Sequence, residues 1–79
     1  MHRYQMPRYF FNVMNGVKTQ DFDGMALLNL EAARAEAKND IADIMQSHFS
    51  TLGNNWSEWS IEICNGDGVV LLVVPFSAN

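Results

Sequence analysis

The sequence predicts an α+β fold in which a four-stranded antiparallel sheet carries one helix on one face. Residues 30–49 have helical periodicity, strand-like stretches lie on both sides of them, and turn dipeptides divide each flank into a hairpin. The expected element order is β-β-α-β-β. The 79 residues are expected to form one domain, with a flexible tail at residues 1–6.

The first predicted hairpin precedes the helix. Residues 8–14 are rich in aromatic side chains and predict a strand, and residues 15–16 (Asn-Gly) favour a two-residue type I′ turn. Residues 17–20 then predict a short polar strand and residues 21–24 a second turn, after which residues 25–28 lead into the helix cap. The first strand would place on one face Tyr9, Phe11 and Val13, and on the other Arg8, Phe10, Asn12 and Met14.

The predicted helix covers residues 30–49, and Asn29 is its expected N-cap. Residues 31–38 consist of strong helix formers. The apolar positions recur at steps of three and four and would form one stripe against the sheet: Leu30, Ala33, Ala37, Ile41, Ile44, Met45 and Phe49.

The second predicted hairpin follows the helix. Residues 57–64 alternate between polar and apolar side chains, so Trp59, Ile61 and Ile63 are expected to face the core. Residues 65–68 form a turn motif, and residues 69–74 form an apolar strand that ends at Pro75.

The polarity of the strands predicts their order. The first strand is apolar on both faces and belongs in the centre, whereas the polar second strand belongs at an edge. The all-antiparallel order is then 2-1-3-4, which leaves the apolar last strand at the other edge. A bare edge of this kind is an aggregation hazard, so we expect a second copy to cover it by strand pairing or by packing of sheet faces. The candidate interaction surface of this homodimer consists of Phe10, Met14, Val70, Leu72 and Val74. The alternative is a monomer in which the last strand is central and buried.

Composition narrows the classes of partner and the compartment. Five basic residues stand against nine acidic ones, and the net charge of −4 disfavours nucleic acid or an anionic membrane as a partner. The single Cys64 excludes an internal disulfide and fits a reducing compartment. The N-terminus has no apolar stretch like that of a signal peptide, and the apolar run at residues 69–76 is too short to span a bilayer. A cytoplasmic protein is expected.

Several motifs occur in a fixed order along the chain: Met-Pro-Arg-Tyr-Phe-Phe at residues 6–11, Asp-Phe-Asp-Gly at 21–24, Leu-Glu-Ala-Ala-Arg-Ala-Glu-Ala at 30–37, Asp-Gly at 67–68 and Val-Pro-Phe at 74–76. This series resembles a family of short bacterial proteins, found mostly in alphaproteobacteria such as rhizobia, whose domain has no assigned function. The resemblance implies a cytoplasmic bacterial protein and no particular activity. Asn12 stands where members of the family often have histidine.

No motif in the chain predicts a catalytic, cofactor or metal site. Asp21, Asp23 and Gly24 resemble part of a calcium loop, but the spacing would make Thr19 the first ligand and Leu30 the bidentate one, so a turn is the better interpretation. The two histidines, His2 and His48, have no metal-ligand spacing. Cys64 has no basic neighbour in sequence and is expected to be inert. Trp59 is expected to cap the core, and Trp56 to pack on the end of the helix near Phe49.

The sequence bears on three classes of function. The excess of apolar surface favours a non-enzymatic interaction or regulatory protein that is homodimeric and binds a protein partner. The alternative is a nucleic-acid-binding or antitoxin-like module, for which the sequence offers Arg8 among aromatic residues. An enzyme has no positive indication in the sequence.

Overall fold

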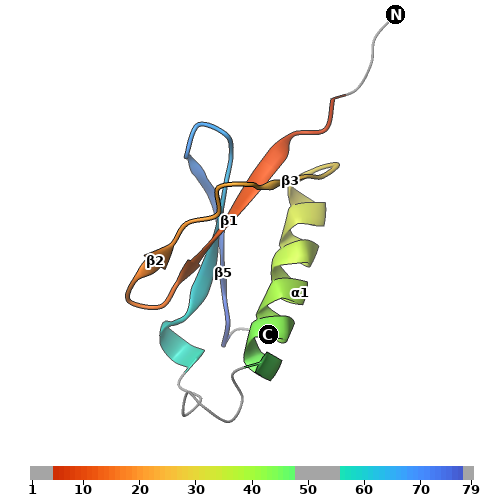
Figure 1. Ribbon diagram of the computed structural model, residues 1–79. Helices are drawn as coiled ribbons and strands as arrows, with labels where there is room; N and C mark the ends of the chain where they lie inside the picture. Colours follow the sequence, from red (N-terminus) through yellow and green to blue (C-terminus); the bar gives the residue numbers. More distant parts are fainter. Residues whose placement is uncertain (1–4, 48–55, 78–79) are drawn as a thin grey trace, which may run out of the picture.

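The computed structural model describes residues 5–47 and 56–77, which form a sheet with one helix lying along one face (Figure 1). In chain order the elements are β1 (Arg8–Met14), β2 (Lys18–Thr19), β3 (Met25–Ala26), α1 (Leu30–Ser47), the 3₁₀ helix η1 (Trp56–Glu58), β4 (Ser60–Cys64) and β5 (Val70–Pro75). The α+β class expected from the sequence is confirmed.

The sheet has the order β2-β1-β4-β5, and every pairing in it is antiparallel. This is the order that strand polarity predicted. The sheet also contains β3, which the sequence analysis had treated as a lead into the helix and which pairs with the start of β1. Residues 20–24 therefore interrupt a strand that runs along β1 in two short pieces, β2 and β3. Between β1 and β2 the loop is one residue longer than a two-residue turn, because Met14 pairs with Lys18.

Helix α1 begins at the predicted cap. The Oδ1 atom of Asn29 accepts the backbone N–H of Ala32 at 2.9 Å, which satisfies one of the free donors of the first turn. Ala33, Ala37 and Ile41 form its fully buried stripe, at the spacing of four that the sequence shows. The helix is described to Ser47, so the last two predicted residues, 48 and 49, lie outside the described residues.

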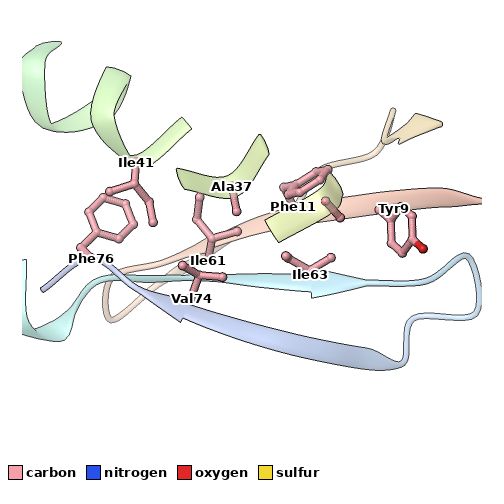
Figure 2. Close-up of a cluster of buried hydrophobic side chains, with 9 residues drawn as sticks. Tyr9, Phe11, Ala37, Ile41, Ile61, Ile63, Val74 and Phe76 are labelled. Atoms are coloured by element: carbon pink, nitrogen blue, oxygen red, sulfur yellow. The ribbon is translucent and has the colours of Figure 1, made fainter. Parts of the chain in front are cut away.

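The core fills the space between α1 and the sheet (Figure 2). Alanine at the first two buried helix positions allows α1 to approach the sheet closely, and larger side chains fill the space near Ile41. The sheet and the residue after it contribute Tyr9, Phe11, Ile61, Ile63, Val74 and Phe76. All of these side chains lie on the helix side of the sheet. No described helix covers the other face, here called the open face, although Asn12 and Cys64 on that face are buried.

Aromatic rings close one end of this core. The predicted strand at residues 57–64 is shorter in the structure, because Trp56–Glu58 form η1 and β4 begins at Ser60. The ring of Trp56 stacks on Phe76 at a centroid distance of 5.6 Å, and Trp59 lies 5.4 Å from the same ring. Both tryptophans pack against the core, which confirms the expectation for Trp59. The predicted neighbour of Trp56, Phe49, lies outside the described residues.

Candidate interaction surface

The open face is built by alternate residues of four strands. Phe10 pairs with Cys64 and Asn12 with Glu62, so these side chains share the face away from the helix. On β5 the partners of Cys64 and Glu62 are Val70 and Val73. The helix-facing residues of β1, β4 and β5 belong to the core or pack against it, so each of these three strands contributes one row to each face.

The exposed apolar side chains of the C-terminal half of the chain are concentrated on and beside β5. They are Val69, Val70, Leu71 and Val73. Strand β5 pairs with β4 on one side, and no described strand pairs with its outer side. Residues 69–76 contain no charged side chain. The outer edge of β5 therefore combines unpaired backbone with exposed apolar surface.

The structure corrects the expected surface at Leu72 and Val74. A register shift between Ile63 and Cys64 places Leu72 opposite Ile63 but Val70 opposite Cys64, so Leu71 is an extra residue on β5. Because the bulge changes the phase of the alternation, Val70 lies on the open face while Leu72 and Val74 point to the helix. Val74 is 5% exposed and belongs to the core, and Leu72 packs against it.

The other two expected residues, Phe10 and Met14, lie on the open face, where both are half-buried. Phe10 continues across Cys64 to Val70 on β5, whereas Glu62 lies between Asn12 and Val73. The Lys18 ammonium lies 3.8 Å from the Glu62 carboxylate, and this partly exposed ion pair contributes little to stability. The open face is therefore apolar near β5 and of mixed charge near β2.

A turn centred on Asp21 holds the interrupted edge on the far side of β1. One carboxylate oxygen accepts the backbone N–H of Phe11 at 3.1 Å, and the other accepts those of Asp23 and Gly24 at 3.1 and 3.2 Å. Burial alone would raise the pKa of Asp21, but these three N–H donors hold it below its usual value. The carboxylate thus replaces the backbone pairing that β1 lacks between β2 and β3.

Gly24 ends this turn in a conformation that favours glycine. Its φ is +69°, and a Cβ atom there would lie 2.8 Å from both the Phe10 ring and the Tyr9 carbonyl oxygen. The turn therefore lies against β1 with no room for a side chain at this position. The Arg8 guanidinium donates to the Asp23 carbonyl at 2.8 Å and holds the same segment.

Asn12 connects this turn to β4. It is buried, its Oδ1 accepts the Asp21 backbone N–H at 2.9 Å, and its Nδ2 donates to the Cys64 sulfur at 3.4 Å. Burial raises the pKa of the Cys64 thiol, and the Glu62 carboxylate raises it further, so the thiol is protonated and a poor nucleophile. Above Asn12 lies an open cavity of about 220 Å³ between Phe10, Phe22 and the turn at Asn65–Gly68.

A second open cavity, of about 320 Å³, lies between α1 and the edge formed by β2 and β3. Glu36 and Asp40 line it from the helix and Asp21 from the turn. Burial raises the pKa of Asp40 to about 6, and the negative charges of Glu36, Asp43 and Asp21 contribute to the shift. These carboxylates are not a metal site: residues 5–47 and 56–77 hold no group of three or more His, Cys, Asp or Glu side chains arranged for an ion.

None of the helices within the described part of the chain has the length and apolar character needed to cross a membrane. Within residues 5–47 and 56–77, the fold defines a small α+β domain in which no helix covers one face of the sheet and no strand pairs with the outer side of β5.

The chain belongs to a family described as a domain of unknown function (DUF6894), whose model matches residues 8–77. No curated protein and no solved structure shows a significant match to this chain.

Sequence reasoning missed the hydrogen-bonded group formed by Asn12, Asp21 and Cys64. The sequence did contain a signal for the turn at Asp21. An aspartate whose carboxylate accepts the backbone N–H groups two and three residues further along the chain is typical of an Asx turn. The contacts of Asp21 to Phe11 and of Asn12 to Cys64 join residues 10 and 52 positions apart, and no local pattern carries that information.

Proposed function

We propose that this chain is a cytoplasmic, non-enzymatic interaction or regulatory protein that is homodimeric and binds protein through its open face and the outer edge of β5. The observation that carries the proposal is the cluster of exposed apolar side chains along an edge that no described strand pairs: Val69, Val70, Leu71 and Val73. Apolar surface of this kind on a sheet edge is a feature of protein-binding modules, which add a partner's strand or pack a partner on the sheet.

The chemistry of the remaining polar groups supports a binding rather than a catalytic role. The carboxylate of Asp21 accepts three backbone N–H groups, and Asn12 is engaged by Asp21 and Cys64. Groups held in this way stabilise the fold and are not available to a substrate. The nucleic-acid alternative has less support, because the Arg8 guanidinium binds the Asp23 carbonyl and the net charge is −4.

Affinity purification of the tagged chain from its native cell, followed by mass spectrometry, tests the proposal. The expected result is a partner recovered in stoichiometric amount by the natural chain and lost when Val70 and Val73 are both replaced by serine. Val17→Ser is the matched control, since Val17 is also an exposed valine but lies in the loop between β1 and β2. Recovery that is unaffected by the double substitution, or no stoichiometric partner at all, would contradict the proposal.

A further inference from the structure

The backbone of β5 indicates which of its groups face outward. Phe76, the residue after β5, donates its N–H to the carbonyl of Trp59, the residue before β4, at 3.0 Å. In an antiparallel pair, hydrogen-bonded and non-hydrogen-bonded positions alternate, so Val74 bonds inward to β4 and Val73 directs both its N–H and its C=O outward. Pro75 occupies the next outward position, where a missing N–H costs nothing to the fold.

We propose that β5 pairs with the β5 strand of a second copy, antiparallel, with the two-fold axis between the two Val73 residues. The inference rests on the proposed function and specifies one of its partners and the way in which that partner binds. An outward N–H and an outward C=O on one residue are self-complementary about a two-fold axis, because each copy donates to the carbonyl of the other. The Val73 side chain is 49% exposed and would meet its own copy across the axis.

Both ends of β5 limit how far this pairing extends. On one side Pro75 offers a carbonyl but no N–H, and on the other side the bulge at Leu71 breaks the regular spacing of outward groups. The register is thereby fixed at Val73 rather than free to slip along a uniform apolar strand. Because one short strand forms few hydrogen bonds and can bury only a small area, we expect a dimer of micromolar affinity.

The opposite edge of the sheet explains why a second copy would close the assembly. There β2 and β3 have two residues each, and the Asp21 carboxylate occupies the N–H of Phe11 between them. That edge cannot accept β5 of another copy, so pairing stops at two chains instead of continuing into a fibre. A two-fold axis perpendicular to the sheet also places both helices on one side, and the open faces join into one surface to which each copy contributes Val70 and Val73.

Cysteine cross-linking tests the register. Val73→Cys would place two thiols on the axis, where paired Cα atoms lie about 5.5 Å apart, within the range that a disulfide spans. Val69→Cys is the matched control, since Val69 is 54% exposed, yet it would lie roughly 25 Å from its counterpart in this register. The native Cys64 is buried in both variants. Under oxidised glutathione, we expect Val73→Cys to form a disulfide-linked dimer at least ten times faster than Val69→Cys. Equal rates of dimer formation would overturn the register.

Proline substitution tests the backbone pairing independently. Val73→Pro removes the outward N–H while leaving the bonds to β4, and Val73→Thr keeps the N–H. By sedimentation the proline variant should be monomeric, and Val73→Thr and Phe10→Thr should remain dimeric, each with the circular dichroism spectrum of the natural chain. A dimeric proline variant, or a dimer lost in Phe10→Thr instead, would show face packing and overturn the proposal. A natural chain that is monomeric while still capturing a different protein from the cell would overturn the pairing and the homodimer, and would leave only the protein-binding part of the proposed function standing.

Discussion

The Asp21 carboxylate accepts the backbone N–H of Phe11 at 3.1 Å and thereby fills the gap between β2 and β3 with a side chain instead of a strand. The same carboxylate holds the N–H groups of Asp23 and Gly24. One residue therefore supports both the interrupted edge and the turn that closes against β1.

Replacing Asp21 by alanine should destabilise the chain by about 2 kcal/mol, because three backbone donors lose a charged acceptor and water replaces it only in part. Urea unfolding followed by tryptophan fluorescence would measure the difference. Asp67→Ala, a change to an exposed aspartate in the turn before β5, is the control and should cost less than about 0.5 kcal/mol. Similar losses in the two variants would show that the Asp21 contacts do not stabilise the fold.

Gly24→Ala should be more damaging than Gly16→Ala, although both glycines have positive φ. At Gly16 a Cβ meets nothing within 4 Å, so the cost is backbone strain of about 1 kcal/mol. At Gly24 the same strain is joined by contacts of 2.8 Å with Phe10 and Tyr9, and we expect a total of about 2–4 kcal/mol. Thermal unfolding of the two variants gives the comparison, and equal melting temperatures would contradict the tight packing of this turn.

Stability should fall as the pH rises from about 4 to 6. Asp40 has a pKa near 6 in the folded chain against 3.8 as its ordinary value, so the folded state binds more protons than the unfolded state in this interval. Below pH 4 the group contributes its full stabilisation, and above pH 6 that contribution is lost. Asp21 acts in the opposite sense, because its pKa is lowered in the folded chain. It stabilises the fold at pH values above its ordinary pKa, and this stabilisation is lost as the pH falls through the lowered pKa.

Asp40→Asn isolates this effect. The variant should be more stable than the natural chain at pH 7 by about 1 kcal/mol, after allowance for solvent screening of a half-buried group, and should lack the slope between pH 4 and 6. Asp67→Asn is the matched control and should keep the slope. Urea unfolding at several pH values is the measurement, and a slope that persists in Asp40→Asn would assign the proton uptake to another group.

The helix and the strand order could be predicted because their signals are local. Ala33, Ala37 and Ile41 recur at helical spacing, and the polar residues 17–20 mark an edge strand without reference to the rest of the chain. Strand β3 could not be predicted, because its two residues are too few to show the alternation of polar and apolar side chains that marks a strand. Its pairing depends on the turn that Asp21 holds.

The bulge in β5 could not be predicted for a different reason. Residues 69–74 are all apolar, so the phase of their alternation cannot be derived from polarity. The phase is set by pairing with β4, where Ile63 and Cys64 take partners that are two residues apart on β5. This is why Leu72 and Val74 were expected on the surface and Val73 was not.

Sedimentation equilibrium of the natural chain tests the central claim most directly. The outer edge of β5 is held to be a self-associating surface, so at about 100 µM the mass should approach twice the 8.9 kDa of one chain and should fall toward one chain on dilution through the micromolar range. A mass of 8.9 kDa that does not change over this range would contradict the account.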